Sequence, residues 1–301
     1  MAILCLYDDM DELKRRLGNI YVGQTYDGKA IFARDLKAEG AMATLLKDAI
    51  KPNLVQTIGQ TPAIIHGGPF ANIAQGTNTI IATRTGLSLA DYVVTEAGFA
   101  SDLGAEKFFD IKCVKAGLKP QAVVLVATIR ALKYHGGVDV ENLKKEDVNA
   151  LLRGMANLEK HIENMRKFKV VPIVAINHFT DDTEAEIHAL KARCAELGVE
   201  AHLADVWAKG GDGATELAEA VVNTIDKGES NFSPIYKWSE GIEKKINRIS
   251  TEIYGADGVE YSAQAKKDIQ RIKDLGMAGL PVCIAKTQKS LSDDPKKIGR
   301  P

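Results

Sequence analysis

Apolar runs alternate with amphipathic stretches through the middle of the chain. Residues 122–127 and 170–176 are apolar throughout, which is typical of strands covered on both faces in a parallel sheet. Between these runs, residues 148–165 repeat apolar side chains every three or four positions, the period of a helix with one buried face. A further short strand is predicted at 201–206. The alternation predicts an α/β fold in which helices flank a parallel sheet, with smaller α/β domains beside it.

The same periods and the turn residues predict the other elements. Gly23 and the pair Asp27-Gly28 interrupt an alternating stretch, so a hairpin is expected there. The full set of further predictions is a hairpin over 18–30, helices at 9–16, at 37–50, from about 71, after 182, at 239–254 and at 262–275, and strands at 57–68, 91–96 and 281–286.

The ends of two predicted strands suggest a phosphate site. Residues 91–96 form a short β-branched run that ends in Glu96, and Gly98 follows two residues later. In P-loop nucleotide-binding proteins, an acid at this place holds the magnesium shell and a glycine amide approaches the terminal phosphate. The next strand is followed by polar Thr128 and Arg130, at the edge where open α/β sheets bind ligands. The pattern predicts a P-loop NTPase-like sheet, although an acid at a strand end is also a common helix cap.

A ring-binding site is predicted after the two later strands. Asn177 with Asp181 or Asp182 matches a pattern in which amide and carboxylate groups read a nucleotide base, and Phe179 supplies a ring to stack on it. Trp207 stands at the end of the next strand, where an exposed indole is unfavourable unless a planar ligand covers it. Asp181 or Asp182 could instead cap the following helix, and both roles can hold at once.

The sequence allows two interpretations for each of two segments, Gly67-Gly68 and residues 101–110. Gly67-Gly68 precede the helix predicted from about Ala71, and they either cradle an anion or only turn the chain. Residues 101–110 combine acids, glycine and aromatic residues without a clear period, which fits either a mobile switch or a solvated connector.

Charge and cysteine content narrow the class of protein. The 301 residues carry 39 Lys and Arg against 40 Asp and Glu, so no basic surplus predicts binding to nucleic acid or to an anionic membrane. No apolar run reaches membrane-spanning length and the first residues lack a signal-peptide pattern, so a cytoplasmic protein is expected. Reduced core thiols are predicted for Cys5, Cys113, Cys194 and Cys283, and no structural metal site is predicted.

No window of the chain supplies a complete phosphate loop. Residues 18–25 approach the pattern G-x-x-x-x-G-K-[ST], but Gln24 stands in place of the lysine. That lysine supplies positive charge to the β- and γ-phosphates, and glutamine cannot replace it.

Long motifs give the chain a resemblance to the formate–tetrahydrofolate ligase family. They are TPAIIHGGPFANIA at 61–74, VATIRALKYHGG at 126–137 and TEIYGADGVEY at 251–261, together with the stretch 93–113. The part HGGPFANIA looks like a diagnostic signature of that family. Chance agreement over such lengths is negligible, and the resemblance extends along nearly the whole chain.

The resemblance implies ATP-dependent ligation of formate to tetrahydrofolate, giving 10-formyltetrahydrofolate through formyl phosphate. It implies ATP and Mg²⁺ as cofactors, small-molecule partners and a homo-oligomer. In similar proteins the pterin or adenine ring lies between aromatic side chains, which match Phe179 and Trp207 here. Asn177 and Asp182 are expected to assist ring binding, and Glu96, Gly98, Thr128 and Arg130 are expected near the phosphates and Mg²⁺.

Departures from the family pattern lead to a further expectation. The family's phosphate loop precedes the residue that matches Met1, and its last segment follows Pro301, so the chain alone is expected to be an inactive fragment. The alternative is a non-catalytic fragment that binds folate or nucleotide, or that pairs with other subunits. Smaller departures are Thr180 for proline, Gln75 for histidine, Thr77 for cysteine and Lys289 for tyrosine.

Three domains are predicted. Residues 1–165 are expected to be the remainder of a nucleotide-binding domain, 166–255 a ring-binding α/β domain, and 256–301 the start of a truncated C-terminal domain.

Overall fold

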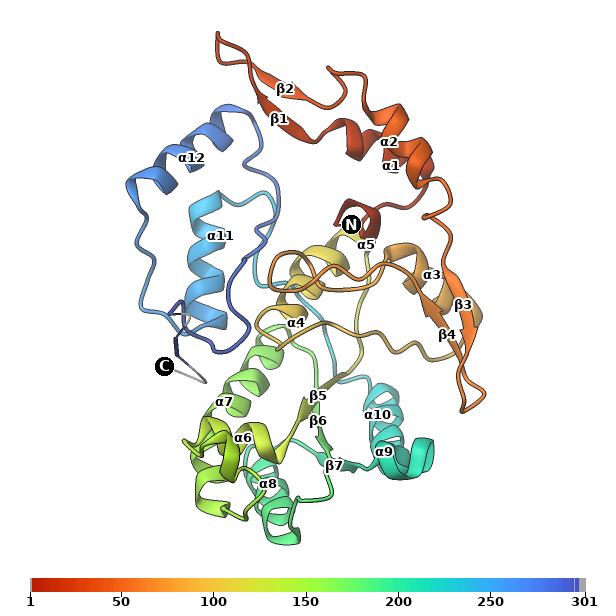
Figure 1. The fold of residues 1–301 in the computed structure, drawn as a ribbon, viewed down its shortest axis with the longest axis vertical. Coiled ribbons are helices and arrows are strands. Elements are labelled where there is room, and N and C mark those ends of the chain that lie inside the picture. The colour runs from red at the N-terminus through yellow and green to blue at the C-terminus, as the bar shows by residue number, and fades with distance from the viewer. Residues whose placement is uncertain (1, 295, 298–301) are drawn as a thin grey trace. The chain divides into compact units, whose positions relative to one another are not determined.

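The computed structural model describes residues 2–294 and 296–297, and the chain divides into two compact units (Figure 1). The first unit contains the residues up to Leu118, Tyr236–Asn247 and Gly258–Ala285. The second contains Lys119–Ile235, Arg248–Asp257 and the residues from Lys286 onward. These units do not test the three predicted domains, with boundaries at 165 and 255, which stay a prediction.

A parallel sheet forms the centre of the second unit. Its strands are β5 (Val123–Ala127), β6 (Pro172–Asn177) and β7 (Ala201–Ala204), in the order β5-β6-β7. In β6, every residue before Asn177 is buried, as expected of a central strand covered on both faces. The α/β fold with a parallel sheet and flanking helices is therefore confirmed.

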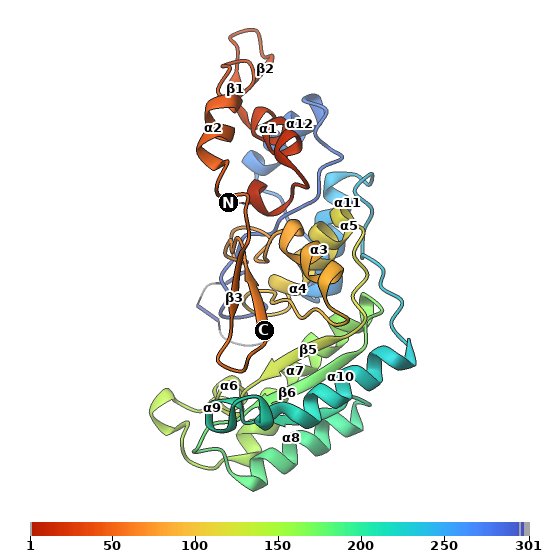
Figure 2. The same cartoon turned by 90° about the vertical axis from the view of Figure 1, so that its right-hand side faces the viewer.

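Helices surround this sheet within the second unit. They are α6 (Ile129–His135), α7 (Val148–Lys167), α8 (Glu184–Glu196), α9 (Val206–Lys209), α10 (Thr215–Lys227), and the short helices η3 (Val140–Asn142), η4 (Gly210–Ala214) and η5 (Ile249–Ile253). Helices α7 and α8 pack against each other, and α10 packs on β6 and β7 (Figure 2). The predicted apolar stripe of α7 is core, since Leu151, Met155 and Ile162 are at most 1% exposed.

Helices α6 and α7 approach each other closely enough for their backbones to touch. A Cβ added to Gly154 would lie 1.8 Å from the carbonyl oxygen of Leu132, and one added to Gly136 would lie 1.9 Å from that of Ala150. Only residues without a side chain fit at these two positions. The contact fixes α6, and with it the residues that begin this helix.

A buried ion pair connects the end of α6 to the beginning of α8. Lys133 Nζ lies 2.9 Å from Glu186 Oε1, and these side chains are 1% and 0% exposed. Glu186 also accepts hydrogen bonds from the backbone N–H groups of Asp147 and Thr183. The carboxylate is thus compensated on several sides.

The first unit combines short helices with two separate hairpins. Its elements are η1 (Ile3–Cys5), α1 (Met10–Gly18), β1 (Tyr21–Gln24), β2 (Ala30–Phe32), α2 (Glu39–Leu46), β3 (Asn53–Gln56), β4 (Pro62–Ile65), α3 (Ile80–Leu89), α4 (Gly104–Lys107), η2 (Phe108–Cys113), α5 (Val114–Ala116) and α12 (Ala263–Asp274), and α11 (Ile242–Arg248) ends at its boundary. The pairs β1–β2 and β3–β4 are antiparallel, which confirms the hairpin predicted over 18–30. Tyr7, Leu13, Leu17 and Ala43 form a core cluster under α1 and α2.

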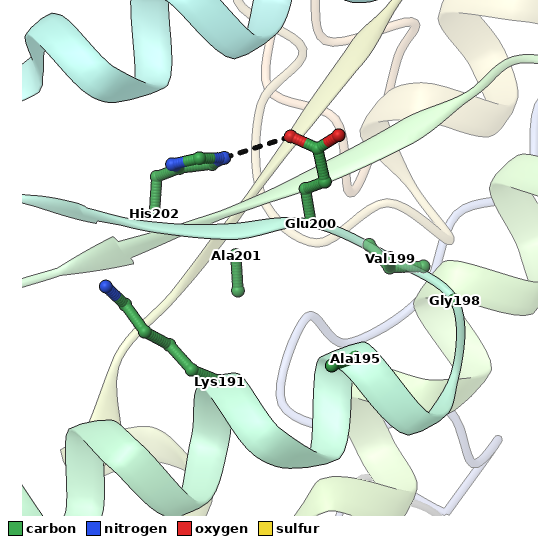
Figure 3. Close-up of a pocket in the computed structure, with 7 residues that line it drawn as sticks. All are labelled: Lys191, Ala195, Gly198, Val199, Glu200, Ala201 and His202. Atoms are coloured by element: carbon green, nitrogen blue, oxygen red, sulfur yellow. Dashed lines mark hydrogen bonds and ion pairs between the residues drawn. The ribbon is translucent and has the colours of Figure 1, made fainter.

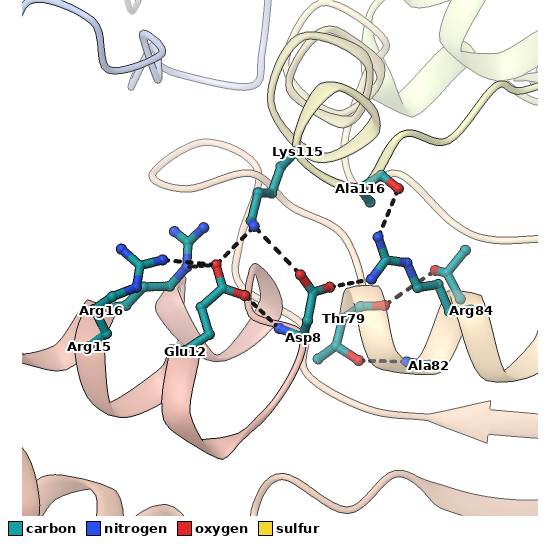
Figure 4. Close-up of polar contacts among 10 residues, drawn as sticks. Asp8, Glu12, Arg15, Arg16, Thr79, Ala82, Arg84, Lys115 and Ala116 are labelled. Atoms are coloured by element: carbon teal, nitrogen blue, oxygen red, sulfur yellow. Dashed lines mark hydrogen bonds and ion pairs between the residues drawn. The ribbon is translucent and has the colours of Figure 1, made fainter.

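Polar side chains tie the start of α1 to α3 and α5 (Figure 4). Asp8 pairs with Arg84 and, at 3.5 Å, with Lys115, whose Nζ also lies 2.8 Å from Glu12 Oε1. Burial alone raises the pKa of Glu12, but hydrogen bonds from Lys115, the Asp8 backbone and Arg16 outweigh burial and lower this pKa to about 2.

Three predicted elements are absent from the described residues. Residues 91–96 are extended but unpaired, with Val94 92% exposed, and only Ala97 forms a bridge, to Thr77. The apolar β-branched residues favour an extended backbone, but no neighbouring strand pairs with it. The segment from Ala71 makes a turn, and the next helix begins only at Ile80, after Thr79 caps it by accepting from Ala82 N. Residues 281–286 form no strand, again for lack of a pairing partner.

The segment 101–110 is neither a switch loop nor a solvated connector, because most of it lies in the buried helices α4 and η2. Glu106, Lys107, Asp110 and Lys112 are 0% exposed. Lys107 donates to the carbonyl oxygens of Ala71 and Ile284, and Lys112 donates to Asn78 Oδ1 and Thr83 Oγ1. Because the helix is buried all round, its sequence shows no amphipathic period. The prediction of a loop is wrong here.

The cysteine prediction is right at three of four positions. Cys5, Cys113 and Cys194 are buried thiols, and Cys283 is free but exposed. The apolar residues around Cys283 therefore do not place it in a core.

Candidate functional site

The carboxyl ends of the three parallel strands carry most of the predicted site residues. The register pairs Ala127 of β5 with Ile176 of β6, and Asn177 of β6 with Ala204 of β7. The residues that follow these pairs therefore leave the sheet at the same edge. Ligands of open α/β sheets bind at this edge.

A tight turn follows β6 and presents Phe179. The N–H of Phe179 donates to Asp182 Oδ2 at 2.8 Å, and the N–H of Asp182 donates to the Phe179 carbonyl at 2.9 Å. Thr183 caps α8 in a capping box with Glu186, so neither Asp181 nor Asp182 is the cap. Burial raises the pKa of Asp182, although the hydrogen bond from Phe179 opposes this rise. Asp182 thus holds the turn.

Asn177 keeps its side-chain amide available. Among the described residues, no hydrogen bond involves this amide, and the side chain is only partly buried. An amide offers both a donor and an acceptor, the groups needed to read a heterocycle. Its place at the end of the central strand fits the predicted role.

Helix α6 begins at the same edge and contributes Thr128 and Arg130. Thr128 is the N-cap, and its hydroxyl oxygen accepts from Ala131 N at 3.1 Å. The guanidinium carbon of Arg130 lies 4.3 Å from the centre of the Phe179 ring. Arg130 Nη2 donates to Asp181 Oδ2 at 2.6 Å. Arg130 therefore contacts the turn after β6 directly.

A histidine and an aspartate at this edge were not predicted from the sequence. His178 Nδ1 lies 3.2 Å from Asp205 Oδ1, and Lys209 Nζ lies 3.1 Å from Asp205 Oδ2. The hydrogen bonds from His178 and Lys209 lower the pKa of Asp205. His178 and Asp205 each follow the observed end of a strand, β6 or β7, but Asp205 falls inside the strand predicted at 201–206, so no signal in the sequence would have paired them.

Trp207 lies on the short helix α9, one residue past the strand predicted at 201–206 and three residues past the observed end of β7, and is 84% exposed. Strand β7 ends at Ala204, and Asp205, the N-cap of α9, begins the change to a helical backbone. No ring contact links Trp207 to Phe179 in the described part of the chain. Both rings nevertheless follow the carboxyl ends of neighbouring strands, with exposed surface on the indole.

Glu96 and Gly98 belong to the first unit. Glu96 is exposed, and the N–H of Gly98 donates to the Gly76 carbonyl at 2.9 Å. The other six predicted site residues all belong to the second unit: Thr128, Arg130, Asn177, Phe179, Asp182 and Trp207. The roles of all eight residues stay predictions.

A shallow hollow of about 440 Å³ lies elsewhere on the second unit (Figure 3). Lys191 and Ala195 of α8 line it together with Ala201 and His202, at the amino end of β7. Its position is opposite to the edge where the strands end, and His202 Nε2 contacts only Glu200 in it, at 3.2 Å. The hollow is therefore not the predicted site.

The fold is that of an α/β protein with a parallel sheet, a class in which ligands bind at the carboxyl edge of the sheet. The family model of formate–tetrahydrofolate ligase matches residues 1–301, so the chain belongs to this family. The family consists of enzymes that ligate formate to tetrahydrofolate with ATP. The resemblance identified from the four motifs is therefore confirmed. In the described part of the chain, no helix has both the length and the apolar character needed to cross a bilayer.

Proposed function

We propose that the carboxyl edge of the sheet in the second unit binds the planar ring of a substrate, either tetrahydrofolate or the adenine of ATP. The observation that carries the proposal is the placement of Asn177, Phe179 and Trp207 after neighbouring strand ends. An indole that is 84% exposed gains apolar contact when a flat ring covers it. The free amide of Asn177 supplies the polar recognition that such sites need.

The chemistry proposed for the family reaction has two steps. A formate oxygen attacks the γ-phosphorus of ATP and ADP leaves, which gives formyl phosphate. N10 of tetrahydrofolate then attacks the formyl carbon, inorganic phosphate leaves and the nitrogen loses its proton. Arg130 and the hydroxyl of Thr128 are the groups that we assign to the phosphate side of the site, since a guanidinium stabilises charge on a transferring phosphoryl group.

For Mg²⁺ we propose Glu96 as a ligand. Within the described residues, no three His, Cys, Asp or Glu side chains are grouped to hold a metal ion. Mg²⁺ is commonly bound through one or two carboxylates with substrate phosphates and water, so a single exposed carboxylate fits this role. The ion would neutralise phosphate charge during transfer. Gly98, in the same unit as Glu96, is assigned to a phosphate oxygen beside this ion, but its N–H must first leave the Gly76 carbonyl.

We further propose that this polypeptide binds the ring but does not transfer a phosphoryl group by itself. In the one near-match to a phosphate loop, Gln24 ends strand β1 of a hairpin, and its side-chain amide donates to the Gly28 carbonyl at 3.1 Å. A phosphate loop leads from a strand into a helix and needs a lysine. Neither condition is met at this place.

Calorimetric titration of the 301-residue chain with tetrahydrofolate and with ATP, each alone, tests these proposals. Binding of one ligand is expected, and Trp207→Ala should weaken it about two- to ten-fold, the range for loss of one aromatic stack. Tyr26→Ala is the matched control, because this aromatic residue is fully exposed on the first unit's hairpin. Absence of heat with both ligands, or an unchanged affinity in Trp207→Ala, refutes the ring site.

A ligation assay with formate, ATP and tetrahydrofolate, read by chromatography of the 10-formyl product, tests the proposed inactivity. No product above background is expected, and product formation refutes it. Light scattering of the same preparation tests the homo-oligomer that the resemblance implies.

A further inference from the structure

The guanidinium of Arg130 covers one face of the ring that is proposed to bind the ligand. Its central carbon lies 4.3 Å from the Phe179 ring centre, the separation of a cation–π contact. Asp181 fixes the guanidinium from the side, through the 2.6 Å hydrogen bond to Nη2. Both ion-pair partners are about one-third exposed, so the contact lies at the surface, where a ligand can reach it.

The arginine leaves part of its hydrogen-bonding capacity unused. Its Nε is buried and, among the described residues, has no acceptor. A buried donor without an acceptor destabilises the arrangement that contains it. Rotation of the guanidinium away from the ring therefore regains a hydrogen bond to water, at the loss of the stack.

Neighbouring charges allow the arginine to move without leaving a carboxylate unpaired. Lys144 Nζ lies 3.8 Å from Asp181 Oδ2 and can stay beside it. Asp182 on the same turn is engaged by the Phe179 N–H, and the charges of His178 and Arg130 both act on it. The turn itself is held by backbone hydrogen bonds that do not involve Arg130.

We propose that Arg130 is a gate over Phe179, closed in the ligand-free chain and displaced when a planar ring stacks on that face. A planar cation and a flat heterocycle use the same surface of the phenyl ring, so they exclude each other there. The inference rests on the proposed ring site and adds that Arg130 opposes ring binding. It makes Arg130 a positioning residue for Phe179 rather than a contact of the ring.

Affinity measurements test the gate. A cation–π contact at an exposed site is worth about 0.5–1 kcal/mol, so Arg130→Ala should bind tetrahydrofolate, which carries no phosphate for Arg130 to contact, about two- to five-fold more tightly than the unchanged chain. Lys144→Ala is the matched control, because it removes a positive charge beside Asp181 without uncovering the ring. Because Lys144 is also the cation that stays beside Asp181 when Arg130 moves, Lys144→Ala should bind with unchanged or lower affinity, and a tightening equal to that of Arg130→Ala would show a general charge effect and overturn the gate. Weaker or unchanged binding by Arg130→Ala overturns the gate.

A second measurement needs no ligand. Phe179→Trp places an indole under the guanidinium, and in a background with Trp207→Phe and Trp238→Phe the acrylamide quenching of its fluorescence reports how well the ring is covered. Adding Arg130→Ala should increase the quenching, and adding Lys144→Ala should not. Equal quenching in the presence and absence of Arg130 overturns the gate. If quenching rises but neither ligand binds, the proposed ring site fails while the covering of Phe179 stands.

Discussion

The buried pair of Lys133 and Glu186 should be the most sensitive point of the second unit. Lys133→Met keeps a similar volume but removes the ammonium that lies 2.9 Å from Glu186 Oε1. The carboxylate then stays at 0% exposure without its cation. Since α6 carries Arg130 and α8 follows the turn with Phe179, the substitution also loosens the two elements that frame the ring face.

The expected loss is about 3–5 kcal/mol in free energy of unfolding, the cost of removing one partner of a buried pair. Burial by itself raises the pKa of Glu186, but the hydrogen bonds from Lys133 and from the Asp147 and Thr183 backbones outweigh it and hold this pKa below its ordinary value. A lowered carboxyl pKa stabilises the fold above the unfolded pKa. Without Lys133, burial dominates and raises the pKa of Glu186 in the variant, so the difference between variant and unchanged chain should shrink as the pH falls through that raised pKa towards the lowered pKa of the unchanged chain.

Hydrogen exchange read by mass spectrometry is the assay, because it resolves the second unit from the first. Protection of the β6 amides should fall by roughly two to four orders of magnitude in Lys133→Met. Peptides from α1 in the first unit serve as the internal reference. Lys144→Met is the control, since this lysine is 74% exposed and its loss should change stability by less than about 0.5 kcal/mol. Protection of β6 within three-fold of the unchanged chain, on the order of 0.6 kcal/mol, would refute the reasoning.

Two further predictions concern single positions. Because hydrogen bonds lower the pKa of Glu12, Glu12→Gln should remove about 1 kcal/mol of stability at neutral pH once solvent screening of this surface cluster is allowed for, and the difference should vanish as pH falls from about 4.5 towards 2 in urea titrations of the chain. Gly154→Ala should lower the free energy of unfolding by about 3 kcal/mol, because the new Cβ meets the Leu132 carbonyl oxygen and backbone cannot rotate aside. Gly40→Ala, in a helix with open space around it, should instead be neutral or stabilising by about 0.5–1 kcal/mol, and a thermal scan that ranks these two variants the other way would contradict the packing argument.

The elements with an unambiguous period were predictable from the sequence. Strands β5 and β6 were predicted from continuous apolar runs, and helix α7 was predicted from its apolar stripe. In each case the pattern that identifies the element lies within the element's own residues. The segment 91–96 shows the limit of this reasoning. Its residues favour an extended backbone, but a strand also needs a partner, and pairing is a property of distant residues.

The buried helix at 104–113 shows a second limit. Lys107 and Lys112 look solvated in sequence, and their acceptors, such as the Ile284 carbonyl and Thr83 Oγ1, lie far along the chain. Burial of a charge is possible only when such partners are supplied, and no local pattern reveals them.

For the site, the sequence indicates the strand ends but not the contacts between them. Asn177 and Phe179 follow β6 as expected, because a parallel sheet brings strand ends to one edge. The stacking of Arg130 on Phe179 and the pairing of His178 with Asp205 depend on loop geometry that no spacing rule gives. Asp182 proved to hold the turn, a role that its place near a helix start conceals.

Lys107 and Lys112, the two buried lysines of the helices α4 and η2, can also report when the first unit unfolds. Their amines are enclosed, and burial lowers the pKa of Lys112 to about 8, so this amine is more readily neutral, and hence nucleophilic, than an ordinary lysine once it is reached. Acylating reagents and trypsin act on surface lysines of the native chain, whereas these two sites become accessible only when the surrounding helices separate. Acylation at Lys112 would therefore time the loss of the native interior without any engineered label.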